Sequence, residues 1–292
     1  MDQFCEVNGV RLCYRTYGRP DGVPVVLILG LGLQLIYWPE ALLKALSDQG
    51  FYVVIFDNRD AGRSSRIKQR PPTLWQQLTR NVGTEVYDLQ DMAQDTLALM
   101  DHLALVRAHL VGMSLGGMIA QTIASDHPSR VLTLTSIFST TGAPNVGQPS
   151  VKTLLQFAKP PARTAQTYVA RYIKMARAIG ATHYPMTEQE LAAYAEQAWV
   201  RGNGLSISAG VGRQIAAIFK SGDRTSDLAR ITAPTLVIHG DKDVMVNPNG
   251  GVATAKAIRG AEFYILQGLG HSLPNACAED LARLLLKHFK KA

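Results

Sequence analysis

The sequence has little cysteine and no long apolar run. Its three cysteines, Cys5, Cys13 and Cys277, are an odd number without metal-site spacing, so we expect free thiols. No stretch reaches the roughly 18 to 20 apolar residues that span a bilayer as a helix. The first residues lack a basic region followed by an apolar core. We therefore expect no secretory signal, no transmembrane segment and a cytoplasmic location.

Acidic residues are also scarce. The chain has 23 Asp and Glu against 30 Lys and Arg, a formal net charge of +7, which raises the question of a nucleic-acid partner. The basic residues are scattered, and their one cluster, residues 287–291, ends a predicted helix where cations suit the dipole. Residues 141–228 hold ten Lys and Arg against five Asp and Glu. We expect a solvated basic surface, mildly favourable to anionic ligands, and no nucleic-acid partner.

The chain alternates predicted strands and helices. Its 292 residues are enough for one large α/β domain with an insertion, or for two small domains. Apolar runs predict strands at residues 25–29, 52–56, 109–111, 131–137, 235–239 and 262–266, and periodicity predicts helices from about 39, 88, 118, 252 and 276. An Asn8-Gly9 turn predicts a hairpin within residues 6–14. We therefore predict an α/β fold with a mostly parallel sheet and helices on both faces.

The alternation breaks between residues 141 and 228. No stretch there resembles a buried strand, and Thr187-x-x-Glu190 is the capping box of a helix. We predict a helical cap over residues 141–228, inserted between two late strands, and a core formed by residues 1–140 and 229–292. The Tyr, Met, Ile and Trp side chains of the cap fit an apolar pocket and equally fit the packing of its own helices.

A Gly-x-Ser-x-Gly pattern lies between a predicted strand and a predicted helix. Its serine is Ser114, and its glycines are Gly112 and Gly116, followed by Gly117. In this context the pattern predicts a nucleophile elbow, a tight strained turn that raises the serine hydroxyl above the sheet edge. Side chains two residues before and after the serine would clash, and Gly117 would let the helix approach the sheet.

A serine nucleophile needs a base, and the base needs an orienting acid. His271 follows the last short strand between glycines and is the predicted base. Asp243, in the turn after a strand, is the favoured acid, and Asp241 stays the competitor. Six histidines lack such a setting and are expected to be structural: His102, His109, His127, His183, His239 and His288.

Acyl transfer also needs backbone N–H groups that stabilise the oxyanion. The amide of Leu115, directly after Ser114, is one predicted donor. The second would come from the turn after the strand at residues 25–29, where Leu31 in Gly30-Leu31-Gly32 is the best candidate. An alternative is that these glycines serve only the turn.

In order and spacing, these motifs resemble those of the α/β-hydrolase superfamily along nearly the whole chain. The resemblance is carried by residues 112–117, 57–64, 240–243 and 270–271. Residues 37–39 and 57–64 are most similar to the aclacinomycin methylesterase-like carboxylesterases. Two positions depart from the common pattern: Leu29 replaces a frequent histidine before Gly30, and Asp60 replaces a frequent glycine. The resemblance implies a Ser-His-Asp hydrolase that needs no metal and no organic cofactor.

We therefore expect a serine carboxylesterase that acts on a small, apolar ester through an acyl-enzyme intermediate. Ser114 would attack the carbonyl, His271 would take its proton, and Asp243 would hold the imidazole. One alternative is a hydrolase of carbon–carbon bonds in vinylogous diketones, which uses a similar triad. Another is a ligand-binding member of the fold without turnover. The substrate's chain length and the oligomeric state are not determined by the sequence.

Overall fold

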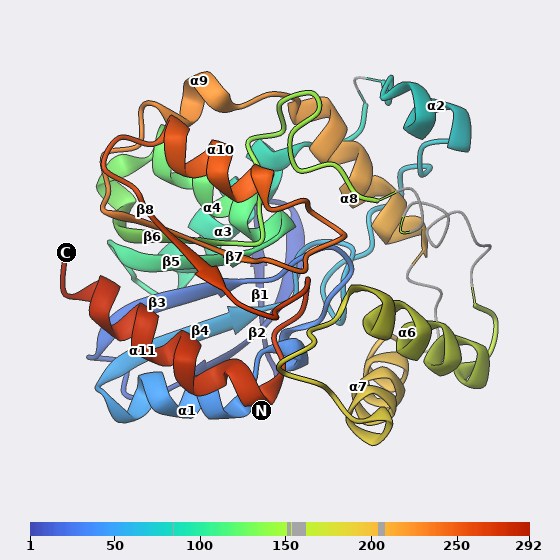
Figure 1. Ribbon diagram of the computed structural model, residues 1–292, viewed down its shortest axis with the longest axis horizontal. Coiled ribbons are helices and arrows are strands. Elements are labelled where there is room, and N and C mark those ends of the chain that lie inside the picture. Colours follow the sequence, from blue (N-terminus) through green and yellow to red (C-terminus); the bar gives the residue numbers. More distant parts are fainter. Residues whose placement is uncertain (84, 151–152, 154–161, 204–207) are drawn as a thin grey trace.

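The computed structural model describes residues 1–83, 85–150, 153, 162–203 and 208–292. In this part of the chain, eight strands form one sheet in the order β1-β2-β4-β3-β5-β6-β7-β8 (Figure 1). The strands are β1 (Gln3–Val7), β2 (Val10–Tyr17), β3 (Val23–Ile28), β4 (Phe51–Phe56), β5 (Ala108–Met113), β6 (Val131–Ile137), β7 (Thr235–Gly240) and β8 (Glu262–Leu266). From β4 to β8 all neighbours are parallel, and only the β1–β2 and β2–β4 pairs are antiparallel. The predicted α/β architecture is confirmed.

The hairpin at the start of the sheet has the predicted turn. Asn8 and Gly9 both have positive φ angles, 49° and 72°, as a type I′ turn requires. The turn places Val7 opposite Val10, and β2 then pairs with β4 in the antiparallel direction.

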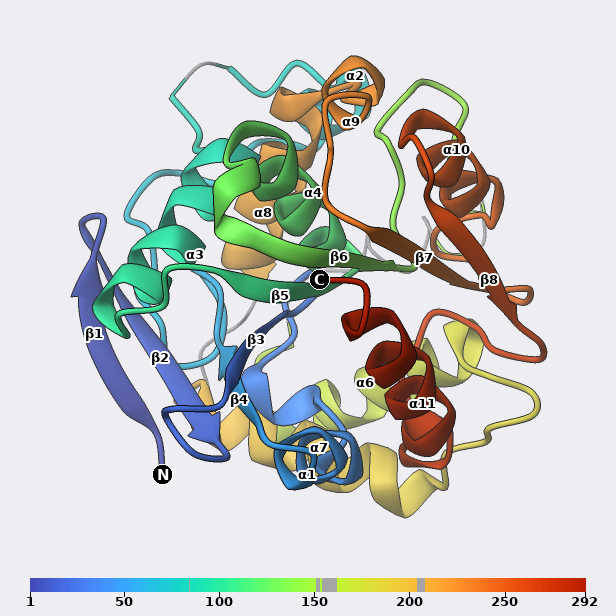
Figure 2. The same ribbon diagram turned by 90° about the vertical axis from the view of Figure 1, so that its left-hand side faces the viewer.

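Helices cover both faces of the sheet. Figures 1 and 2 show α3, α4 and α10 on one face and α1 and α11 on the other. The described helices are α1 (Glu40–Asp48), α2 (Leu74–Thr79), α3 (Leu89–His102), α4 (Leu115–Asp126), α6 (Ala165–Ile179), α7 (Glu188–Arg201), α8 (Ser208–Ser221), α9 (Thr225–Leu228), α10 (Asn249–Ala257) and α11 (Ala278–Phe289). Short 3₁₀ turns are η1 (Leu35–Tyr37), η2 (Pro128–Arg130) and η3 (Asn275–Cys277). The short helix α2 was not predicted. Among the described residues, no helix combines the length and hydropathy needed to cross a membrane.

The helices on both faces of the sheet explain why the central strands consist of consecutive apolar residues. In β3, Val26 and Ile28 pack into the core beside α3 and α4, whereas Val25 and Leu27 pack into the core beside α1 and α11. All four side chains are fully buried. A strand covered on both faces needs apolar side chains at every position, so it shows no alternation with polar residues.

The regular structure described between β6 and β7 is helical, and two buried arginines join these helices to the sheet. Arg201, at the end of α7, lies 3.1 Å from Asp57 and 3.0 Å from Asp2. Arg213 of α8 donates two hydrogen bonds to Asp60, at 2.6 and 2.8 Å. Asp57 and Asp60 are the acidic residues of the turn after β4. These pairs tie α7 and α8 to the sheet edge.

We expect replacement of Arg201 by Met to destabilise the fold strongly. Asp57 is fully buried, and Arg201 supplies its positive partner. Removing one partner of a buried pair costs about 3 to 5 kcal/mol because the other charge stays in the interior unpaired. Urea denaturation measures the change. Arg283→Met is the matched control, since Arg283 pairs with Asp280 at an exposed position; equal stability of both variants would contradict the prediction.

Candidate active site

Ser114 lies in a strained turn between β5 and α4. Its φ and ψ angles are 56° and −119°, a region that non-glycine residues rarely adopt. Glycines make the turn possible: a Cβ on Gly112 would lie 2.1 Å from the Gly116 carbonyl oxygen. A Cβ on Gly116 would lie 2.0 Å from the Ile28 carbonyl oxygen. The turn is held by the Ser114 N–H, which donates to the Ile137 carbonyl at 2.7 Å.

The Ser114 hydroxyl begins a series of hydrogen bonds that runs through His271 to Asp243. His271 Nε2 lies 3.0 Å from Ser114 Oγ, and His271 Nδ1 lies 2.7 Å from Asp243 Oδ2. A carboxylate only accepts, so Nδ1 carries a proton and donates it to Asp243. In the neutral imidazole, Nε2 is then the acceptor and faces the serine hydroxyl. This tautomer is the one that can take a proton from Ser114.

The Asp243 carboxylate is fixed on both of its oxygens. Its Oδ1 accepts the backbone N–H groups of Met245 and Val246, each at 2.8 Å, and its Oδ2 faces His271. Burial alone would raise the pKa of Asp243, but the imidazoles of His271 and His239 lower it to about 2. Asp243 is therefore ionised at neutral pH although its side chain is fully buried.

The competing acid, Asp241, has a different environment. Its carboxylate accepts the Gly268 N–H at 2.5 Å and pairs with Lys242 at 3.0 Å. The bond to Gly268 connects the turn after β7 to the loop after β8, which carries His271. Asp241 thus holds the loop that carries His271, whereas Asp243 contacts the imidazole directly.

The His271 loop is supported by α6. The His271 N–H donates to the Ile179 carbonyl at 2.6 Å. A Cβ on Gly270 would lie 2.2 Å from the carbonyl oxygens of Ile179 and Gly180, so only glycine permits this approach. The end of α6 therefore helps to set the position of the imidazole, a contact that the sequence pattern does not reveal.

The two predicted oxyanion donors lie beside Ser114. Leu115 is the first residue of α4, where a backbone N–H has no acceptor within the helix. Leu31 follows Gly30, whose added Cβ would lie 3.1 Å from Ser114 Cβ. Gln214 of α8 accepts the Gly32 N–H at 2.9 Å and so holds this turn. Between the described residues, no hydrogen bond uses the N–H of Leu31 or Leu115.

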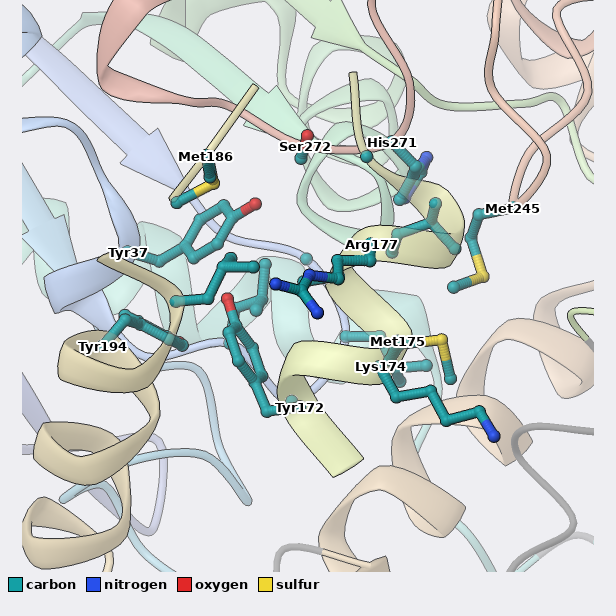
Figure 3. A pocket seen from close by; sticks show the side chains of 18 of the residues that line it. Tyr37, Tyr172, Lys174, Met175, Arg177, Met186, Tyr194, Met245, His271 and Ser272 are labelled. Atoms are coloured by element: carbon teal, nitrogen blue, oxygen red, sulfur yellow. The ribbon is translucent and has the colours of Figure 1, made fainter. Parts of the chain in front are cut away.

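A cavity of about 520 Å³ opens onto Ser114 and His271. Figure 3 shows Tyr37, Tyr172 and Tyr194 gathered on one side of this cavity. Tyr172 and Tyr194 lie in contact, with ring centroids 5.0 Å apart. Burial raises the pKa of Tyr37 to about 12, so its phenol stays neutral. The described lining contains three cations and no carboxylate: Arg171, Lys174 and Arg177.

Two sets of side chains at the site were not assigned to it from the sequence. The tyrosines come from η1, α6 and α7, and periodicity alone cannot separate a pocket face from a packing face. His239 was expected to be structural, yet its Nε2 lies 3.3 Å from Asp243 Oδ2. Its place four residues before Asp243, at the end of a buried strand, was the available signal. Within the described chain, no group of three or more His, Cys, Asp or Glu could hold a metal ion.

Comparison with curated proteins identifies hydrolases over most of the chain. Rhodomycin D methylesterase DauP from Streptomyces sp. strain C5 is 29% identical over 296 residues, covering 94% of this chain and 93% of that protein. The putative carbamate hydrolase RutD from Variovorax paradoxus is 28% identical and covers 89% of each chain. These relatives support a hydrolase and agree with the resemblance to methylesterases drawn from the sequence.

Solved structures and a family model agree on the fold. The enol-lactonase from Burkholderia xenovorans LB400 has a TM-score of 0.75 at 23% identity, covering 99% of this chain and 100% of that chain. The meta-cleavage product hydrolase CumD from Pseudomonas fluorescens IP01 has a TM-score of 0.76 at 20% identity, covering 99% and 97%. A family model described as the alpha/beta hydrolase fold matches residues 23–274. The chain therefore belongs to the α/β-hydrolase family.

Proposed function

We propose that this protein hydrolyses a carboxylic ester with Ser114 as nucleophile, His271 as general base and Asp243 as the orienting acid. The series of hydrogen bonds from the serine hydroxyl to the imidazole and the carboxylate, at 3.0 and 2.7 Å, carries the proposal. The positive φ angle of Ser114 supports it, because strain in a non-glycine residue concentrates at functional sites.

The reaction proceeds in two halves. Ser114 Oγ attacks the ester carbonyl while His271 Nε2 takes the hydroxyl proton, and the imidazolium then protonates the departing alcohol. Water attacks the acyl-serine next, with His271 again as base, and the carboxylic acid leaves as Ser114 Oγ regains its proton. Asp243 stays ionised throughout and stabilises the imidazolium.

The oxyanion of each tetrahedral intermediate is bound by two backbone N–H groups. We assign these to Leu115 at the start of α4 and to Leu31 in the turn after β3. The N-terminus of α4 adds a favourable dipole for negative charge at this position. Donors that are already oriented need no reorganisation when the charge develops, which is why they lower the barrier.

The substrate in this proposal is a small molecule with an apolar body. A volume of about 520 Å³ is within the usual range of small-molecule sites, and the tyrosines and Met186 offer apolar contact area. The methylesterase relatives support an ester with a small alcohol group. We propose that residues 141–228 form a cap over this cavity, because α6 and α7 supply much of its lining.

Hydrolysis of p-nitrophenyl esters with acyl groups of increasing length tests the proposal. We expect turnover together with labelling of Ser114 by a fluorophosphonate probe, and a length preference set by the cavity. A folded protein that neither turns over the esters nor reacts with the probe would contradict the proposal and favour a ligand-binding member of the fold. Turnover of a vinylogous diketone with no ester hydrolysis would instead indicate a carbon–carbon bond hydrolase.

A further inference from the structure

A second histidine lies against the carboxylate that orients His271. His239, in β7, is fully buried, and its Nε2 lies 2.9 Å from the Val246 carbonyl oxygen and 3.3 Å from Asp243 Oδ2. A carbonyl oxygen can only accept a hydrogen bond, so Nε2 of His239 carries the proton. The same N–H therefore donates to Val246, and its nitrogen lies 3.3 Å from the Asp243 oxygen that accepts from His271.

The other nitrogen of the His239 ring lies close to α10. Its Nδ1 is buried and has no hydrogen-bond partner among the described residues. A Cβ on Gly251 would lie 2.6 Å from Nδ1, so the glycine of α10 leaves just enough room for the ring. A proton on Nδ1 would be a buried donor without an acceptor, which is costly. The neutral ring with its proton on Nε2 satisfies this environment best.

We propose that His239 is a positioning residue for the reaction, acting through Asp243 on His271. Its N–H holds the turn from Asp243 to Val246 and withdraws negative charge from Asp243 Oδ2. This inference rests on the proposed function, in which Asp243 orients the base. It gives the buried histidine a role in tuning the proton affinity of His271 in addition to packing.

The contacts around the carboxylate support this role. Met245 and Val246 donate their N–H groups to Asp243 Oδ1 at 2.8 Å, while Oδ2 accepts from His271 at 2.7 Å and lies 3.3 Å from His239 Nε2. The shorter distance makes His271 the principal partner. The His239 N–H, which donates to Val246, lies second nearest to Oδ2, so its positive end can offset part of the charge on Oδ2 without replacing the main contact.

Among the described residues, the titratable groups that act on this carboxylate come from two elements. His239 belongs to β7, and His271 belongs to the loop after β8. Two described neighbours of the imidazoles do not titrate: Phe138, after β6, packs on both rings with centroid distances of 5.9 and 5.6 Å, and Gly251 borders His239. A change in the pH dependence of catalysis on substitution of His239 would therefore act through Asp243 and His271.

The sign of that change follows from electrostatics. The positive end of the His239 N–H dipole near Asp243 Oδ2 offsets part of the negative charge and weakens the attraction of the carboxylate for an imidazolium. Loss of this N–H strengthens that attraction, so His271 retains its second proton up to a higher pH. Because a protonated imidazole cannot act as base, the acidic limb of the kcat profile should move to higher pH. The loosened turn should also misplace Asp243 and lower kcat.

His239→Met and His239→Gln form a matched pair for the test. Methionine has similar bulk and no donor, whereas the glutamine amide nitrogen carries two N–H groups for the two acceptors. We expect the methionine variant to lose kcat on the order of tenfold, the lower end of the loss that follows removal of a hydrogen-bond partner behind a metal-ligating histidine. Its KM should change little and its acidic limb should shift upward, while the glutamine variant restores both.

Rates are divided by the concentration of active sites titrated with the fluorophosphonate probe, so that unfolded protein does not count. An unchanged kcat and acidic limb in the methionine variant would overturn the inference, as would equal losses in both variants without a shift. Wild-type protein without serine-dependent turnover or labelling would instead refute the proposed function. Should the variants not fold, ¹⁵N-histidine NMR of the wild type decides: a His239 ring protonated on Nδ1 rather than Nε2 overturns the inference.

Discussion

Replacement of Ser114 by Ala should reduce kcat/KM for ester hydrolysis by about 10⁴- to 10⁶-fold. His271 Nε2 lies 3.0 Å from the Ser114 hydroxyl, and the substitution leaves the base without a nucleophile to activate. The substrate would still bind, and the N–H groups proposed for the oxyanion would still be present, so a small residual rate from water attack is expected. The measurement is steady-state hydrolysis of the best p-nitrophenyl ester.

The fold should tolerate this change. Alanine has the same backbone restrictions as serine, so the strained turn keeps its shape, and the melting temperature should stay close to that of the wild type. Ser125→Ala is the matched control, because Ser125 is a buried serine of the helix that follows Ser114, α4, and its hydroxyl donates to the Thr122 carbonyl. Substantial turnover by the Ser114 variant, or an equal loss in the Ser125 variant, would contradict the assignment of the nucleophile.

Replacement of Asp243 by Asn should lower kcat by about 10⁴-fold, because the wrong tautomer of His271 would be stabilised. The N–H groups of Met245 and Val246 both donate to Oδ1 and would select the oxygen of the asparagine amide. The amide nitrogen would then face His271 Nδ1, which must accept instead of donate. His271 Nε2 would carry the proton and could no longer take one from Ser114.

Asp241→Asn is the control for this prediction. Asp241 is two residues away and accepts the Gly268 N–H through a carboxylate oxygen, a contact that an amide oxygen can keep. We expect this variant to retain most of the wild-type kcat, measured in the same assay. If Asp241→Asn lost more activity than Asp243→Asn, Asp241 and not Asp243 would be the acid that orients His271.

Many helices and strands could be predicted because their signals are local. The Asn8-Gly9 turn, the buried runs of β3, β4 and β6, and the capping box at Thr187 each depend on neighbouring residues, and the structure contains all of them. The short helix α2 escaped prediction, since six residues give too little periodicity to detect. The order of the strands in the sheet also follows from tertiary pairing and not from any single segment.

The candidate site was partly predictable for the same reason. Ser114, Asp243 and His271 each lie beside glycines or at the end of a strand, and both features can be recognised in a sequence. The contact between His239 and Asp243 was not foreseen, since a histidine at the end of a buried strand is more often a packing residue. For the tyrosines of residues 141–228 both a pocket and a packing role were left open, and the structure places Tyr172 and Tyr194 at the cavity together with Tyr37, which the sequence did not assign to it.

The sequence by itself determined the class of fold and identified the candidate catalytic residues, because backbone conformation and apolar periodicity are encoded within a few neighbouring positions. Only the tertiary structure decided which distant groups meet. Asp60, which departs from the common family motif, is paired with Arg213, 153 residues away. The imidazole of His271 is supported by the end of α6, and His239 reaches the same carboxylate as His271. These contacts depend on the packing of whole elements, for which a linear pattern holds no local signal.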